Sequence, residues 1–394
     1  MAALVTVAHV PGFAERERPA AMSVVATGAG ALALGALGAL LVLVSAVDLF
    51  LTIFNYDGFT TLTTRFHHAL WRLVRGACGA LPEGPRHTAL SLGAASMLPA
   101  TVALWLGLEV TGFALMYDPG LTGGSFAHNG TGSGLGTAFY LSAGAISSLT
   151  FGDVTARSGL DRALVDLETI LGLATFTLAL GYVVTTFGVL GALENLHGRV
   201  RRHAEDPERP SSILARHFRG GSPSDLPSFL QELGDDLESY DQGLRRYPVV
   251  YYFHTRRRRR SIPVVFAALG DLLALLRWGL PPDEPMTEDP FLAALLDGYE
   301  TTVDRLRRSF VGPEPLSIPE PSSRHEYEAG SGEDVQEFRR LQERARASAG
   351  IEDAGGDGYE RYREWFPFAY RKRVILDRVA DALGYDPPRV PAQT

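Results

Sequence analysis

The chain has very little cysteine and almost no lysine. Its 394 residues include one cysteine, Cys78, and one lysine, Lys372, so that nearly all its basic residues are arginines. A single cysteine excludes an internal disulfide and any multi-cysteine zinc site. The ten histidines show no metal-ligand spacing, and we see no acid–base or nucleophile constellation typical of an enzyme. A net charge of −8 argues against a nucleic-acid partner.

Charge is also scarce in the first half of the chain. Residues 1–195 hold 8 Arg or Lys and 12 Asp or Glu, whereas residues 196–394 hold 29 Arg or Lys and 33 Asp or Glu. A soluble domain of typical composition carries roughly a quarter charged residues. The first half falls far below that fraction, so the sequence predicts a membrane domain followed by a soluble one.

Three apolar stretches are long enough to cross a bilayer as helices, which takes about 20 residues. They lie at about 23–55, 90–117 and 163–193. The first carries small residues at helical spacing, and such a stripe favours close helix packing. Its members are Thr27, Ala31, Gly35 and Ala39.

The placement of arginine predicts the orientation of these spans. The linker at 56–89 carries four arginines, whereas residues 118–136 carry no Arg or Lys. Basic loops stay in the cytoplasm. The sequence therefore predicts a multi-pass protein of the cell (plasma or inner) membrane, with its N-terminus outside and its C-terminal half cytoplasmic.

The segment between the second and third spans predicts a re-entrant element. Residues 137–160 read TAFYLSAGAISSLTFGDVTARSGL, which is too short and too polar to cross the membrane again. A helix that enters and returns must be shielded from lipid by protein, because unpaired backbone is not tolerated against hydrocarbon. Such an element lines a polar cavity or a pore.

The same segment resembles the pore loop of tetrameric potassium channels, whose signature is Y-F-S-x-x-T-L-T-T-V-G-Y-G-D-I-T-P. Tyr140-Leu-Ser142 matches its start and Gly152-Asp-Val-Thr-Ala156 its end. The resemblance covers roughly residues 90–195. It implies four copies around one pathway for potassium or sodium, with no other cofactor and no resident metal. It also implies an atypical selectivity filter, formed by Ser148, Leu149, Thr150, Phe151, Gly152 and Asp153.

The filter departs from the family at Thr150, which replaces the first glycine of G-Y-G. Filter carbonyls point inward to replace the hydration shell of the ion. That conformation requires a positive φ, which costs a β-branched residue about 1–3 kcal/mol. We therefore expect reduced potassium selectivity. In a second register, Thr150-Phe-Gly-Asp153 would resemble the T-V-G-D filter of non-selective cation channels.

The third span carries further matches. The resemblance implies a gating hinge at Gly172 and a cavity lined by Leu173, Phe176, Leu180 and Val184; these four also fit a lipid-facing stripe. Glu109 and Glu168 are candidates because charges inside membranes are expensive. They would either support the filter by hydrogen bonds or lie at the aqueous interface.

The second half reads as helices joined by proline-rich breaks, with a C-terminal pair near 334–349 and 359–384. A fourth apolar stretch at 261–281 contains Asp271 and Arg277, which disfavour a membrane span. The run Arg256, Arg257, Arg258, Arg259 and Arg260 precedes it. This run would either contact anionic lipid, at about 1 kcal/mol per basic residue, or form a solvated turn.

We therefore expect an all-α membrane protein, with three transmembrane helices, a re-entrant pore helix and an all-helical cytoplasmic domain. The expected function is a homotetrameric, potassium-channel-like cation channel that also contacts membrane lipids. The alternative is a non-conducting membrane sensor or scaffold that keeps the pore fold. The expected parts are an extracellular tail (1–22), a first span (23–55), a cytoplasmic linker (56–89), a pore domain (90–195), a helical domain (196–310), a disordered linker (311–333) and a C-terminal helical segment (334–394).

Overall fold

The computed structural model describes residues 20–54, 61–128, 132–149, 152–203, 210–219, 225–312, 314–351 and 358–387. Almost all of these residues are helical. The chain divides into two compact units, and we describe each by itself. Unit 1 contains residues 1–49 and 103–177, and unit 2 contains residues 50–102 and 178–394.

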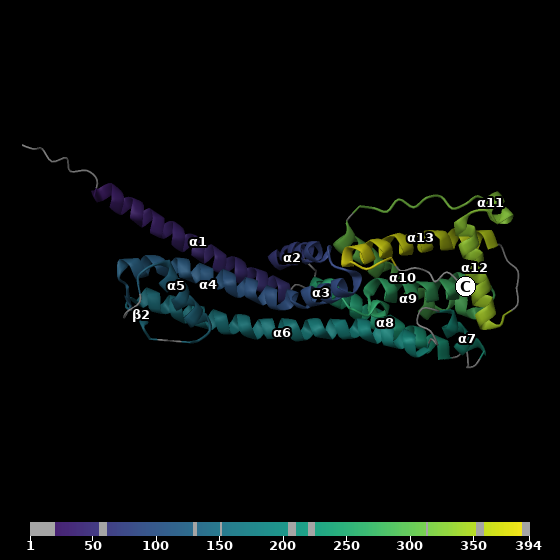
Figure 1. Cartoon of the computed structure of the whole chain (residues 1–394). Coiled ribbons are helices and arrows are strands. Elements are labelled where there is room, and N and C mark those ends of the chain that lie inside the picture. Colours follow the sequence, from purple (N-terminus) through teal and green to yellow (C-terminus); the bar gives the residue numbers. More distant parts are fainter. Residues whose placement is uncertain are drawn as a thin grey trace, which may run out of the picture. The chain divides into compact units, whose positions relative to one another are not determined.

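Unit 1 is built from parts of three long helices and one short helix (Figure 1). The long helices are α1 (Ala20–Phe54), α4 (Met97–Gly123) and α6 (Gly159–His203), and the short one is α5 (Leu135–Ile146). The expectation of an all-α protein needs one addition. Strands β1 (Phe126–His128) and β2 (Val154–Ala156) form an antiparallel ladder with Ala127 opposite Thr155.

Helices α1 and α4 approach so closely that their backbones touch. A Cβ atom placed on Gly38 would lie 2.3 Å from the Gly112 carbonyl oxygen, and one on Gly112 would lie 2.6 Å from the Gly38 oxygen. The first span does pack closely through a small residue, as predicted, but this residue is Gly38 and is not one of the four predicted positions. Gly35 has no neighbour within 4 Å of an added Cβ, and Ala39 is exposed, because the buried face of α1 follows a spacing of 3.5 residues rather than four.

The core of unit 1 is aromatic and lies around the ladder and the short helix. Phe113 and Tyr117 of α4 pack with Phe126 of β1, with Tyr117 edge-on to Phe126. Ala138 of α5 and Val154 of β2 are buried in the same cluster. This packing fixes the segment between α5 and β2 at both of its ends.

Unit 2 begins with two helices in the region expected to be a linker. They are α2 (Leu62–Cys78) and α3 (Glu83–Ala95). The Thr61 hydroxyl caps α2 by accepting a hydrogen bond from the Thr64 amide. Trp71 of α2 donates its indole N–H to the Ala382 carbonyl at 2.9 Å, which ties this region to the end of the chain.

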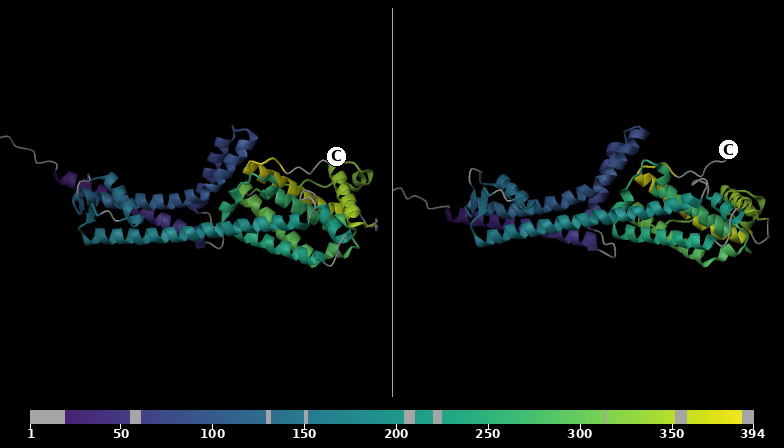
Figure 2. Two further views of the ribbon diagram at one scale, coloured as in Figure 1. Left: turned by 60° about the horizontal axis from the view of Figure 1, so that its bottom comes forward. Right: turned by 90° about the horizontal axis from the view of Figure 1, so that it is seen from below.

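The rest of unit 2 is a helical bundle, which Figure 2 shows in green to yellow. Helices α8 and α10, α9 and α13, and α7 and α12 pack against one another. The C-terminal pair α12 and α13 occupies the two helical pieces expected near 334–349 and 359–384. Their bounds are α7 (Ser211–Arg219), α8 (Leu226–Arg246), α9 (Ile262–Ala274), α10 (Pro290–Leu306), α12 (Glu333–Ala349) and α13 (Gly358–Leu383).

The stretch expected to be a disordered linker contains a further short helix. Helix α11 (Arg324–Ala329) begins with a capping box, in which Ser323 and Glu326 exchange hydrogen bonds with each other's backbone amides. The proline-rich sequence at 311–333 did not predict this helix.

Among the residues that the structure describes, four helical stretches are long and apolar enough to cross a membrane. They are Gly28–Phe54, Glu83–Gly123, Gly159–His203 and Ile262–Gly279. The fourth differs from the others in its surroundings, because 72% of it is buried inside the protein, compared with 22% to 33% for the other three. A helix covered by its own bundle has little surface to offer to lipid.

Candidate functional site

The candidate site is the segment that follows α5 in unit 1. Helix α5 spans 12 residues, about 18 Å at 1.5 Å per residue, which is too short to cross a bilayer. Its C-terminal half is buried, including Ser142, Ala145 and Ile146. The helix ends at Ser147, and Ser148 then adopts a φ of 59°, the one positive φ of a non-glycine residue among those described.

The structure describes four of the six expected filter residues, Ser148, Leu149, Gly152 and Asp153, and they lie between α5 and β2. Gly152 has a φ of 78°, a backbone conformation that glycine adopts without strain. The Tyr140 hydroxyl of α5 donates a hydrogen bond to the Asp153 carboxylate, which ties the end of this segment to the short helix. Leu149 is exposed. Thr150 and Phe151 lie outside the described residues.

Glu168 of α6 is fully buried behind the short helix. Its carboxylate accepts a hydrogen bond from the Ser142 hydroxyl of α5, and a second one from the Tyr117 hydroxyl of α4 at 2.7 Å. One acidic side chain therefore joins the three helices α4, α5 and α6. This geometry favours the filter-support role over a position at the aqueous interface.

Glu109 of α4 is equally buried but contacts different helices. Its Oε1 atom accepts hydrogen bonds from Ser45 of α1 at 3.3 Å and from Thr175 of α6 at 2.9 Å, whereas Oε2 has no hydrogen-bond partner among the described residues. Glu109 thus joins α1 to α6, whereas Glu168 is the carboxylate that contacts α5. Nearby, the Trp105 indole donates to Asp48 at 2.9 Å.

The sequence did not single out the hydroxyl donors at 45, 117 and 175. Their signal is weak, because serine, threonine and tyrosine are common in membrane helices and often bond their own backbone. What marks these three is that each lies on a buried helix face opposite a carboxylate. These donors can therefore be recognised only when it is known which helices are neighbours.

Gly172 of α6 lies directly against the end of α5. An added Cβ would come within 2.4 Å of the Ile146 carbonyl oxygen. Helix α6 continues without a break from Gly159 to His203, so the expected hinge at Gly172 lies within regular helix. The expected cavity-lining residues are all exposed on α6, on the face opposite the buried one: Leu173, Phe176, Leu180 and Val184.

The arginine run lies in unit 2, just before α9. Residues Arg258–Arg260 form a short 3₁₀ helix with no buried member. Arg258 donates to the Pro387 carbonyl at 2.7 Å, and Arg260 lies 3.9 Å from the Glu194 carboxylate. Both the lipid-contact and the solvated-turn interpretations fit these positions.

Comparison with known proteins gives one informative relative. The chain is 20% identical over 285 residues to the uncharacterized membrane protein YdjJ of Bacillus subtilis (strain 168), covering 72% of this chain and 81% of that protein. No family model and no solved structure matches. The relative and the apolar helices together support a membrane location.

Proposed function

We propose that this chain is the subunit of a potassium-channel-like channel for monovalent cations. The observation that carries the proposal is the arrangement around α5. A short apolar helix packs between two long ones through Ser142, Glu168 and Tyr117, and it is followed by a turn in which Gly152 is left-handed. The residues of this turn are those that resemble the channel filter.

The proposed membrane layout has three spans and one re-entrant helix. Helices α1, α4 and α6 span the bilayer, α5 enters it from outside, and α9 belongs to the cytoplasmic bundle. The burial of α9 supports this layout. The arginines at 65, 72, 75 and 86 are in the segment proposed to be cytoplasmic, and the bundle that follows α6 is on the same side.

The proposed assembly is a homotetramer, because one pore segment cannot enclose a pathway. Two features of unit 1 support further copies. The exposed apolar residues on α6 include Leu173 and Phe176, and a hollow of about 320 Å³ lies beside the pore loop between Tyr140, Leu149 and Val165. Neighbouring subunits would cover both surfaces.

In the proposed pathway, backbone carbonyls of residues 148–152 replace part of the hydration shell of the ion. Thr150 replaces a glycine in the family pattern, so we expect a pathway that passes sodium as well as potassium. Glu168 would hold α5 in place from behind, and Gly172 would be the position where α6 bends on opening.

A flux assay with matched glycine variants tests the proposal. Purified protein in liposomes should release potassium, and Gly152→Ala should abolish the flux because alanine is strained at this φ by about 1–2 kcal/mol. Gly124→Ala is the control. Gly124 also has a positive φ (80°) and free space around it, but it lies outside the filter.

The assay separates the channel from the alternative. Flux in wild type and Gly124→Ala, with none in Gly152→Ala, supports a filter at this turn. A folded tetramer that is silent in every form supports the non-conducting sensor or scaffold. Crosslinking in mild detergent should stop at four subunits, and a clean dimer would contradict the assembly.

A further inference from the structure

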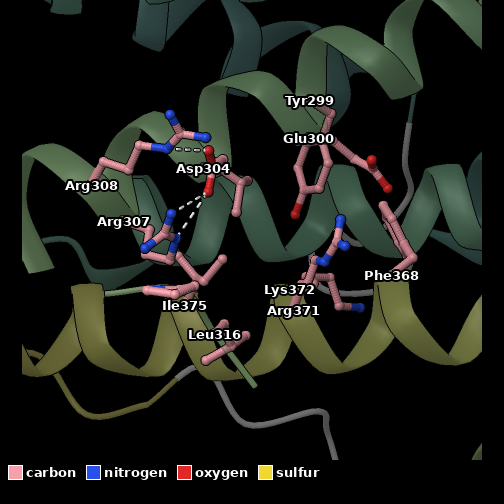
Figure 3. Close-up of a pocket in the computed structure, with 12 residues that line it drawn as sticks. Tyr299, Glu300, Asp304, Arg307, Arg308, Leu316, Phe368, Arg371, Lys372 and Ile375 are labelled. Atoms are coloured by element: carbon pink, nitrogen blue, oxygen red, sulfur yellow. Dashed lines mark hydrogen bonds and ion pairs between the residues drawn. The ribbon is translucent and has the colours of Figure 1, made fainter. Parts of the chain in front are cut away.

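Unit 2 contains a cavity of about 310 Å³ between α10 and α13 (Figure 3). The segment after α10 crosses its mouth, where Leu316 contributes to the lining. Pockets for small molecules commonly start at about 300 Å³. The cavity lies far along the chain from the pore segment, and the proposed channel mechanism makes no use of it.

One side of the cavity is apolar and rigidly held. Tyr299 of α10 and Phe368 of α13 line it with ring centroids 5.7 Å apart. The Tyr299 hydroxyl donates to the Phe266 carbonyl at 2.9 Å, which fixes the ring. Val303 and Ile375 add further apolar lining, and Ile375 lies toward Arg307 (Figure 3). Such a wall favours a compact apolar group over water.

The other side of the cavity is charged, and most of its charges are already paired. Asp304 accepts from Arg307 at 2.8 Å and from Arg308 at 2.6 Å. Lys372 pairs with Asp271, which does not line the cavity. Arg371 makes no ion pair with the residues that the structure describes, and its side chain rises from α13 toward Glu300 (Figure 3).

The two acidic residues in the wall do not cancel this positive charge. Burial favours the neutral form of Asp304, but Arg307 and Arg308 hold its pKa below the ordinary value. Asp304 is therefore ionised, and its negative charge is shared between these two arginines. Burial raises the pKa of Glu300, and the nearby Arg371 offsets only part of that effect. Asp271 compensates Lys372, but Arg307 and Arg308 share one carboxylate, so the lining keeps a net positive charge.

We propose that this cavity binds a small phosphate monoester with an apolar body. The apolar body would lie against Tyr299 and Phe368, with Leu316 across the mouth. The phosphate would bind Arg371, because a guanidinium matches two phosphate oxygens at once. The inference is independent of ion conduction.

Calorimetric titration of the full-length protein in lipid nanodiscs tests this site. Phenyl phosphate is the probe. Two fragments serve as control ligands: inorganic phosphate, which lacks the aromatic ring, and benzyl alcohol, which lacks the charge. We expect phenyl phosphate to bind at least tenfold more tightly than either fragment. Arg371→Gln should weaken it about tenfold, the range expected for one charge-assisted hydrogen bond.

A matched control lies on the same helix. Arg363 of α13 is about half exposed, pairs with Glu360 and does not line the cavity, so Arg363→Gln should leave the affinity unchanged. Leu316→Ala should weaken phenyl phosphate more than inorganic phosphate. Equal affinity for phenyl phosphate and inorganic phosphate, no measurable binding, or an Arg371→Gln variant that binds like wild type would each overturn the proposal.

Discussion

Gly172 of α6 lies against the carbonyl oxygen of Ile146, at the point where the short helix α5 ends. A Cβ at position 172 would also lie 2.6 Å from Ile146 Cγ1 and 3.0 Å from its Cα atom. Backbone cannot move aside as a flexible side chain can. The contact therefore fixes where the turn after α5 begins, and it makes glycine necessary for packing as well as for any bending.

Gly172→Ala should destabilise unit 1. The overlap with Ile146 requires a shift of α5 or α6, and overpacking of this kind costs about 1–3 kcal/mol. Gly181→Ala is the control on the same helix, because Gly181 has nothing within 4 Å of an added Cβ. Thermal unfolding in detergent should show a lower midpoint for Gly172→Ala and an equal or higher one for Gly181→Ala. Equal midpoints for Gly172→Ala and wild type would contradict the close contact.

Ser142→Ala should also lower stability, because it removes a donor from the buried Glu168 carboxylate. The Tyr117 hydroxyl still donates to the Oε2 atom, but leaving the buried Oε1 atom without a donor costs about 1–3 kcal/mol. Thr177→Ala is the control, since the Thr177 hydroxyl is exposed and bonds its own helix. Denaturant unfolding of both variants measures the difference. A Ser142→Ala protein as stable as Thr177→Ala would show that Glu168 does not hold α5.

The stability of unit 2 should fall at acid pH through His254. This buried ring donates from Nδ1 to the Leu383 carbonyl and accepts from His87 at Nε2, both at 3.0 Å. Burial, followed by the charge of His87, lowers the pKa of His254 from 6.5 to about 4. The unfolded chain therefore binds the proton first.

It follows that stability is lost as the pH falls from about 6.5 to 4, by at most about 3 kcal/mol. His254→Gln should flatten this part of the pH profile, whereas His325→Gln, at an exposed position, should not. Unfolding free energies measured between pH 4 and 7.5 test the difference. Parallel profiles for wild type and His254→Gln would contradict the assignment.

The membrane topology can be tested with an impermeant maleimide on intact cells. In a Cys78→Ser background, Thr122→Cys should be labelled from outside, and Arg340→Cys only after the cells are opened. Both positions are exposed, so accessibility within the protein does not limit the reaction. External labelling at position 340 would overturn the three-span layout.

The sequence predicted the features that depend on local pattern. The apolar runs around α1, α4 and α6 are long enough to be recognised from composition alone. The charges at Asp271 and Arg277 disfavour a span at α9, and this stays a prediction, which the burial of α9 inside the protein supports. The spacing of the motif from Tyr140 to Ala156 placed the short helix before the turn. These signals are carried by neighbouring residues and need no knowledge of tertiary contacts.

The features it missed depend on residues far apart in the chain. The α2–α3 region is charged and reads as a loop, but Trp71 is held by a carbonyl 311 positions away. Helices α1 and α4 cross at Gly38 rather than at Gly35, because Gly38 lies opposite Gly112 of α4 and the two glycines together allow the backbones to touch. Likewise, Glu109 was expected near the filter, and its partners proved to be on α1 and α6.

Recording of single channels in planar lipid bilayers tests the central claim most directly. With potassium on one side and sodium on the other, wild-type protein should pass discrete cation currents that reverse near zero voltage. Thr150→Gly should shift the reversal potential toward that of potassium, and a tenfold gain in selectivity corresponds to about 1.4 kcal/mol. A wild type already selective for potassium would contradict the role of Thr150. Purified, tetrameric protein that passes no current in either form would contradict the channel itself.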